Sequence, residues 1–212
     1  MDSITFWGQH GLVALELLAT AAFALSGVVS ALRKRLDIVG VCVCGFLAAF
    51  GGGTLRDLLI DRRPFFWVEH QSVLLGILVL CVLGASVLRQ HHVEETRKSL
   101  QLPDAVGLGL FCATGVHLSS TTGQPALVAI LMGTITGAFG GVLRDLVCNE
   151  IPTLFRDHRP YALCAFAGGA GYLFMTWLGH PNSSAIAACA LITTGLRCLT
   201  LWLDWRLPAH AS

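Results

Sequence analysis

The stretch Gly52-Gly53-Thr54-Leu55-Arg56-Asp57-Leu58 decides the fold, because it returns 88 residues later as Gly140-Gly141-Val142-Leu143-Arg144-Asp145-Leu146. The same ungapped shift aligns Phe23 with Phe111, Gly27 with Gly115, Gly45 with Gly133 and Pro64 with Pro152. Chance matches in apolar sequence produce repeated Leu and Val, whereas a shared Gly-Gly followed by Leu-Arg-Asp-Leu indicates a true internal repeat. The chain therefore consists of two related halves.

The composition is that of a membrane protein. Of the 212 residues, 54% are hydrophobic and only 13% are charged, and the mean hydropathy is +0.68. Soluble domains carry about 25% charged residues, so most of this surface must face something other than water. The apolar residues fall into blocks longer than the ~18 residues that indicate a spanning helix. The formal net charge of +1 gives no argument for a nucleic-acid partner.

The apolar blocks predict an all-α membrane protein with seven transmembrane helices, at 12–32, 37–60, 69–89, 104–121, 125–147, 160–178 and 184–203. We expect one membrane domain over 1–212, with repeat A at 12–89, repeat B at 100–178 and an extra helix at 184–203. The first block is interpreted as a retained helix, because the start of the chain lacks the basic segment of a signal peptide.

Basic residues in the predicted connections set the orientation. Nine of them lie on one side, namely Arg33, Lys34, Arg35, Arg89, Arg97, Lys98, Arg156, Arg159 and Arg206, against Arg62 and Arg63 on the other. This asymmetry predicts an N-terminus outside and a C-terminus in the cytoplasm. Because each repeat holds an odd number of spans, the second copy is expected to be inverted, as in many transport proteins.

The repeated glycines lie inside the second and fifth predicted spans, as Gly51-Gly52-Gly53 and Gly140-Gly141. A glycine in a helix interior costs about 1 kcal/mol relative to alanine, so these runs are expected to loosen the backbone. In hydrocarbon, loosened backbone is tolerated only where it packs in protein or lines a watery cavity. The glycines therefore predict helices broken or kinked along a solute path. The alternative is that they only let helices approach closely.

Charged pairs follow the glycines one turn later, as Arg56-Asp57 and Arg144-Asp145. A charge within a span costs about 2.5–3.5 kcal/mol on insertion scales, so these residues are expected to face a cavity or a partner. Neighbouring helical residues point about 100° apart, so at least one member of each pair is expected to brace the fold.

Three further charged residues receive structural interpretations. Glu16 and Asp104, which correspond in the two repeats, are expected near helix starts, where a carboxylate suits the helix dipole. Arg197, near the end of the last predicted span, is expected to extend its guanidinium to the membrane interface.

Other chemistry finds little support in the sequence. The eight cysteines lie mostly within apolar blocks without a Cys-x-x-Cys spacing, which favours a packing role. The sequence offers no metal-ligand cluster, paired catalytic carboxylates or nucleophile motif, so neither an enzyme nor a cofactor is predicted.

The residues 51–57, followed by Pro64-Phe65-Phe66-Trp67, resemble the bacterial glycine transporter domain family, which is similar to the prokaryotic relatives of trimeric intracellular cation channels. The resemblance implies a homotrimer in the inner membrane, surrounded by lipid that it could also bind. Each protomer would have its own pore, with helices two and five kinked at their glycines. The implied permeant ions are monovalent cations, chiefly potassium, with sodium a second candidate. The second copy departs from the motif in having Phe139 in place of the leading glycine.

Two functions stay open. The first is a cation channel, and the second is a carrier for glycine or a similar small zwitterion held by the same helices. The candidate path residues are Ser26, Gly51, Gly52, Gly53, Thr54, Arg56, Asp57, Thr114, Gly140, Gly141, Arg144 and Asp145.

Overall fold

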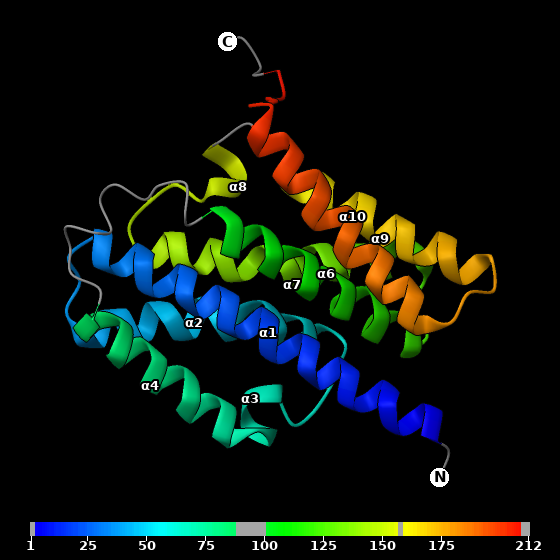
Figure 1. Cartoon of the computed structure of the whole chain (residues 1–212), viewed down its shortest axis with the longest axis horizontal. Coiled ribbons are helices and arrows are strands. Elements are labelled where there is room, and N and C mark those ends of the chain that lie inside the picture. The colour runs from blue at the N-terminus through cyan, green and yellow to red at the C-terminus, as the bar shows by residue number, and fades with distance from the viewer. Residues whose placement is uncertain (1–2, 88–100, 157–158, 209–212) are drawn as a thin grey trace.

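The computed structural model describes residues 3–87, 101–156 and 159–208, and within these ranges it is entirely helical (Figure 1). The helices are α1 (Ser3–Arg33), α2 (Ile38–Leu59), α3 (Phe66–Glu69), α4 (Gln71–Val87), α6 (Gln101–Thr121), α7 (Ala126–Val147), α8 (Thr153–Arg156), α9 (Ala162–Trp177) and α10 (Asn182–Trp202). Most of the charged connection predicted after the third span lies outside the described residues.

The described residues thus form nine helices where the sequence predicted seven. The two additional helices, α3 and α8, have four residues each. Four helical segments are long and apolar enough to cross a membrane: 11–33, 38–59, 126–147 and 182–202. The helices α4 and α9 are apolar but shorter, with 17 and 16 residues. The chain is therefore an all-helical protein with membrane-type helices.

The turns that end α2 and α7 repeat at the 88-residue offset. Asp61 and Asn149 follow these helices with φ values of 54° and 53°, in the left-handed region. The next amide in each turn donates to the carbonyl of the aspartate in the Arg-Asp pair, at 2.8 and 2.9 Å. This pattern closes the last helical turn and redirects the chain toward the short helix that follows.

The pair α2 and α7 lies in the middle of the molecule, packed against each other. α1 and α4 pack against α2, while α6 and α9 pack against α7, and α10 covers α6 and α9. Figure 1 shows α3 and α4 on one side of this arrangement and α9 and α10 on the other. The two halves of the sequence therefore meet along α2 and α7.

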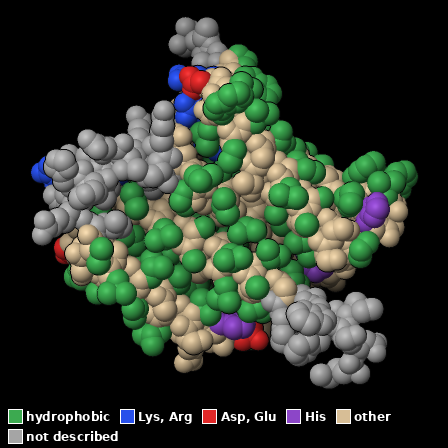
Figure 2. Space-filling view, in the orientation of Figure 1, with side chains coloured by type: hydrophobic (Ala, Val, Ile, Leu, Met, Phe, Trp, Pro, Cys, Tyr) green, Lys and Arg blue, Asp and Glu red, His purple; other side chains and the backbone are tan. Residues whose placement is uncertain are grey.

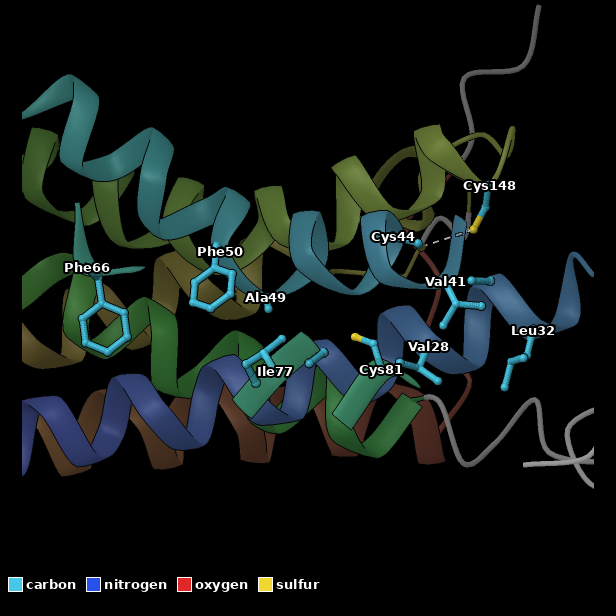
Figure 3. Close-up of a cluster of buried hydrophobic side chains, with 12 residues drawn as sticks. Val28, Leu32, Val41, Cys44, Ala49, Phe50, Phe66, Ile77, Cys81 and Cys148 are labelled. Carbon is cyan, nitrogen blue, oxygen red and sulfur yellow. Dashed lines mark hydrogen bonds between the residues drawn. The ribbon is translucent and has the colours of Figure 1, made fainter. Parts of the chain in front are cut away.

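Small and branched apolar side chains fill the core between α1, α2 and α4. Figure 3 shows this cluster, in which Val28 and Cys81 lie beside α2, and Cys44 approaches Cys148 with 3.7 Å between the sulfur atoms. All eight cysteines are free thiols and six are buried. Their packing interpretation is consistent with these positions.

The outer surface is apolar. Large hydrophobic side chains stand exposed on several helices, among them Leu75, Leu83, Leu127 and Leu191. On the face in Figure 2, hydrophobic and uncharged side chains cover the central area, and charged side chains are visible only at the margins. An apolar area of this extent is stable against lipid rather than water.

Candidate functional site

The helices α2 and α7 meet backbone to backbone through glycines. A Cβ added to Gly52 would overlap the carbonyl oxygen of Thr136, and one added to Gly140 would overlap the carbonyl oxygen of Ala48. These are equivalent contacts, because residues 48 and 52 correspond to 136 and 140 in the repeat. The crossing is therefore reciprocal, as at a two-fold interface where each copy offers the same surface.

The glycines do not break the helices, because both α2 and α7 are continuous through Gly51–Gly53 and Gly140–Gly141. Of the two predicted forms, a break or a kink, only the break is wrong. The ribbon of α2 stays coiled there and changes direction beyond Phe50 (Figure 3). A glycine keeps its helical hydrogen bonds if the surroundings favour the helix, and its missing side chain is used here for close approach. The alternative interpretation, in which the glycines let the helices approach closely, agrees with the contacts of Gly52 and Gly140.

Arg56 is fully buried and lies between two carboxylates. Its Nη1 is 2.8 Å from Oε1 of Glu16 on α1, and its Nε and Nη2 are each 2.8 Å from Oδ1 of Asp57. Arg62 approaches the same Asp57 oxygen at 3.7 Å from the turn after α2. We call Glu16, Arg56 and Asp57 the Arg56 cluster.

Arg144 occupies the equivalent place in the second repeat. Its Nη1 is 2.8 Å from Oδ1 of Asp104 on α6 and also donates to the Ser26 hydroxyl on α1, and its Nε and Nη2 are each 2.8 Å from Oδ1 of Asp145. The second Asp145 oxygen accepts hydrogen bonds from Thr153, at 2.7 Å from its amide and 2.9 Å from its hydroxyl. We call Asp104, Arg144 and Asp145 the Arg144 cluster.

Each cluster holds one arginine and two carboxylates, so each has a formal charge of −1 when all three groups are ionised. The glycine after each crossing glycine lies beside the arginine, where an added Cβ would make an ordinary contact, 3.9 Å from Arg56 Nη2 at Gly53 and 3.7 Å from Arg144 Nη2 at Gly141. The repeated motif thus supplies the helix crossing and the cation together.

The partners that both arginines find on neighbouring helices were not predicted from the sequence. Glu16 was expected at a helix start, but α1 begins at Ser3, so Glu16 lies well within the helix and is 5% exposed. Asp104 does lie in the first turn of α6, yet it is buried against Arg144. The sequence did offer a signal, because an acidic residue lies 40 residues before the arginine of each Arg-Asp pair: Glu16 before Arg56, and Asp104 before Arg144.

Other predicted path residues are more scattered. Ser26 joins the Arg144 cluster, whereas the Thr54 hydroxyl accepts a hydrogen bond from Trp67 Nε1 at 3.1 Å. The buried Thr114 hydroxyl donates to the Phe111 carbonyl at 3.2 Å, and Gly51 faces the Leu143 side chain.

A cavity lies beside each cluster. The one beside the Arg56 cluster has a volume of about 700 Å³, and Glu16, Arg62, Glu69, His70 and Thr114 are among its lining residues.

The cavity beside the Arg144 cluster has a volume of about 90 Å³ and is lined by charged and polar side chains. At its rim, hydrogen bonds from Lys34 and Arg156 lower the pKa of Glu150 below its ordinary value. Arg197, expected at the membrane interface, instead lines this cavity with its side chain 2% exposed. Within the described part of the chain, the two cavities share no lining residue. Among the described residues, no group of three or more His, Cys, Asp or Glu side chains could hold a metal ion.

The comparison with known families agrees with the division of the chain into two repeats. The family model described as glycine transporter matches the chain twice, over 13–90 and 101–177. The chain belongs to this family. Each match covers three of the longer helices and one cluster arginine.

Relatives in the family are named as membrane proteins. The UPF0126 membrane protein of Vibrio cholerae is 33% identical over 211 residues, covering 100% of this chain and 87% of the relative. The UPF0126 inner membrane protein YadS of Escherichia coli is 35% identical over 202 residues, covering 93% of this chain and 95% of the relative.

Solved structures share the fold. The TRIC trimeric intracellular cation channel orthologue from Rhodobacter sphaeroides superposes with a TM-score of 0.82 at 32% identity, covering 92% of this chain and 98% of that one. A prokaryotic TRIC channel crystallised in 0.5 M KCl gives a TM-score of 0.81 at 28% identity, covering 94% and 100%. The chain therefore has the TRIC channel fold.

The glycine crossing predicts a position-specific sensitivity to alanine. In Gly52→Ala and Gly140→Ala the new methyl group meets a backbone carbonyl, so α2 and α7 must separate, and overpacking of this kind costs about 1–3 kcal/mol. We expect a lower thermal unfolding midpoint in detergent for both variants. Gly76→Ala on α4 and Gly195→Ala on α10 are matched controls, because nothing lies within 4 Å of a Cβ there. Equal midpoints for all four variants would contradict the close crossing.

The buried clusters predict a large loss of stability when an arginine is removed. Arg56→Met or Arg144→Met leaves two carboxylates buried without their cation, and breaking a buried pair in this way costs about 3–5 kcal/mol. We expect denaturant unfolding in mixed micelles to shift strongly, whereas Arg206→Met, in the exposed tail, changes little.

A double-mutant cycle isolates the pairing energy of the Arg56 cluster. Glu16→Gln combined with Arg56→Met should cost clearly less than the sum of the two single changes, because each single change already removes the Glu16–Arg56 contact, which the double variant loses only once. Simple additivity would show that the two groups do not interact.

Proposed function

We propose that the chain is a cation channel whose path runs between the two halves, alongside α2 and α7. The observation that carries the proposal is the similarity to TRIC channels, with TM-scores of 0.81 to 0.83 and identities of 28% to 32% across at least 92% of this chain. Identity at this level over more than nine tenths of the chain supports a shared mode of action.

The charge around the Arg56 cluster supports a cation rather than an anion as the permeant species. This buried cluster carries a formal −1, and the cavity beside it is lined by two carboxylates, Glu16 and Glu69, and one arginine, Arg62. Negative groups in a low-dielectric path favour cations and oppose anions. We propose potassium as the main permeant ion, with sodium a second one, because neither cluster offers the rigid oxygen cage that a divalent ion would select.

We further propose that all seven longer helices span the membrane, and that repeat A (12–89) and repeat B (100–178) are inserted with opposite orientation. Position 52 meets 136 while 140 meets 48, so α2 and α7 run antiparallel at their crossing, which supports an inverted arrangement. The basic connections favour an N-terminus outside and a C-terminus in the cytoplasm.

The assembly and location are proposed from the relatives. The Rhodobacter sphaeroides orthologue is named as trimeric, and YadS as an inner membrane protein. We propose a homotrimer in a bacterial inner membrane, in contact with lipid, with one path in each protomer and no catalytic activity.

A glycine carrier is the second candidate, and the description of the matching family favours it. A carrier of a zwitterion needs an anionic group for the ammonium and a cationic group for the carboxylate. Both clusters contain the two kinds of group, although each arginine is already engaged by carboxylates of the protein.

Electrical recording separates the two candidates. The purified protein in planar bilayers should give discrete unitary currents in symmetric potassium chloride, with a reversal potential that follows the potassium gradient. Saturable uptake of radiolabelled glycine into proteoliposomes, with no unitary current, would instead establish the carrier. The Gly52→Ala variant, recorded beside Gly76→Ala, tests whether current depends on the glycine crossing.

A further inference from the structure

Two pairs of cysteines approach each other in the part of the chain that the structure describes. In one pair, Sγ of Cys44 on α2 lies 3.7 Å from Sγ of Cys148, the residue that follows α7. In the other pair, the sulfur atoms of Cys112 on α6 and Cys189 on α10 are 3.8 Å apart. In both pairs the sulfur atoms are in contact, so each pair has the proximity that a reaction between two thiols requires.

The Cys44–Cys148 pair lies at one end of the crossing between α2 and α7 (Figure 3). Ala48 meets Gly140 at this crossing. One turn further along both helices, the Cys44 sulfur is 4.0 Å from the Arg144 carbonyl oxygen. A bond between Cys44 and Cys148 would therefore join the first half of the chain to the second directly beside the contact of their central helices.

The internal repeat does not account for this pair. At the 88-residue offset Cys44 corresponds to Met132 in the second copy. By the same shift Cys148 corresponds to Ile60 in the first copy. Apolar side chains thus take the place of the two thiols at the opposite end of the crossing. The thiols are confined to the end that we propose to face the cytoplasm, where cellular reductants keep thiols reduced until an oxidant is present.

The two cysteine pairs differ in their access to solvent and in the freedom of their backbone. Cys148 is 6% exposed and lies in the turn after α7. Cys44, Cys112 and Cys189 are fully buried within helices. The hydrogen bond from the Cys44 thiol lowers the pKa of Cys148, and the charge of Arg144 acts in the same direction. Because the thiolate is the form that reacts with oxidants, Cys148 is the cysteine of these two pairs that is oxidised first.

We propose that Cys44 and Cys148 form an oxidation-sensitive pair, which closes to a disulfide between the two halves of the chain in the presence of hydrogen peroxide. The Cys148 thiolate attacks one peroxide oxygen, the O–O bond breaks, and the leaving hydroxide takes up a proton to give water. The resulting sulfenic acid on Cys148 is attacked by the Cys44 sulfur, which forms the S–S bond and displaces a second water. Two electrons thus pass from the two thiols to one peroxide.

The geometry requires only a small movement. The two sulfur atoms must approach by roughly 1.7 Å to reach the length of a disulfide bond. Cys148 lies beyond the last turn of α7, so it can shift with less disturbance of helical hydrogen bonds than a residue inside a helix. Once formed, the bond prevents α2 and α7 from separating at this end. It also closes a loop between residues 104 positions apart, which restricts the unfolded chain and stabilises the fold.

Thiol counting measures this bond without any transport assay, so the result is independent of the proposed channel. The purified full-length protein in detergent is treated with hydrogen peroxide, unfolded and alkylated, and its intact mass and peptide map are recorded. We expect the loss of two of the eight thiols, a link between Cys44 and Cys148 within one chain, and recovery of both thiols with dithiothreitol. The oxidised protein should also unfold at a higher temperature until it is reduced.

Single variants test the order of the two steps. Cys148→Ser should form no link and no sulfenic acid at Cys44. Cys44→Ser should form no link but should retain a sulfenic acid at Cys148, which dimedone traps. Cys112→Ser is the matched control, because it removes one thiol of the other contacting pair and should keep the full Cys44–Cys148 link. For a variant that does not fold, alanine in place of serine repeats the test.

Several outcomes would overturn the proposal. One is a loss of thiols that dithiothreitol does not reverse. A link that forms as readily between Cys112 and Cys189, or only between separate chains, would show that the position of Cys148 gives no preference. Eight intact thiols after peroxide treatment would show that the pair does not react.

Discussion

Two arginine side chains, Arg56 and Arg144, lie inside an apolar bundle, and the arrangement of the helices follows from the need to neutralise them. Both arginines are buried, so each must find carboxylates within the protein. The adjacent aspartate supplies one, and α1 or α6 must come close enough to supply the other. Each ion pair therefore fixes the packing of an outer helix on a central one.

The glycine crossing and the ion clusters depend on each other. Gly52 and Gly140 bring the backbones of α2 and α7 into contact, and the residues one turn later then lie on either side of that contact. If the helices were held apart by larger side chains, the space beside each arginine would open to lipid or water. The close contact of α2 and α7 thus keeps both arginines in low-dielectric surroundings, where the attraction of each to its carboxylates is strong.

Much of the helical layout could be predicted from the sequence, because long apolar blocks have few alternatives in a membrane. The spans expected at 37–60 and 125–147 agree with α2 and α7 to within one residue at each end. The start of α1 was missed because residues 3–11 are not uniformly apolar, and α3 and α8 are too short to produce a periodic pattern.

The site was predicted less completely, for a physical reason. The Arg-Asp pairs were evident as charges in apolar sequence, but their partners Glu16 and Asp104 lie 40 residues away in the chain. Only packing in three dimensions brings them within 2.8 Å. The helices bend without breaking at the glycines of α2, because propensity describes an isolated helix, whereas here the neighbouring helix stabilises the glycine segment.

The reciprocal contact between α2 and α7 also says something about how such a molecule could arise. Each half completes the other with the same surface, so a short precursor polypeptide, inserted into the bilayer in both directions, would already bury that surface by pairing with itself. Gene duplication and fusion would then only have to tie together an association that existed before. Afterwards the halves could diverge, as they have where Phe139 stands opposite Gly51 in the alignment of the two copies.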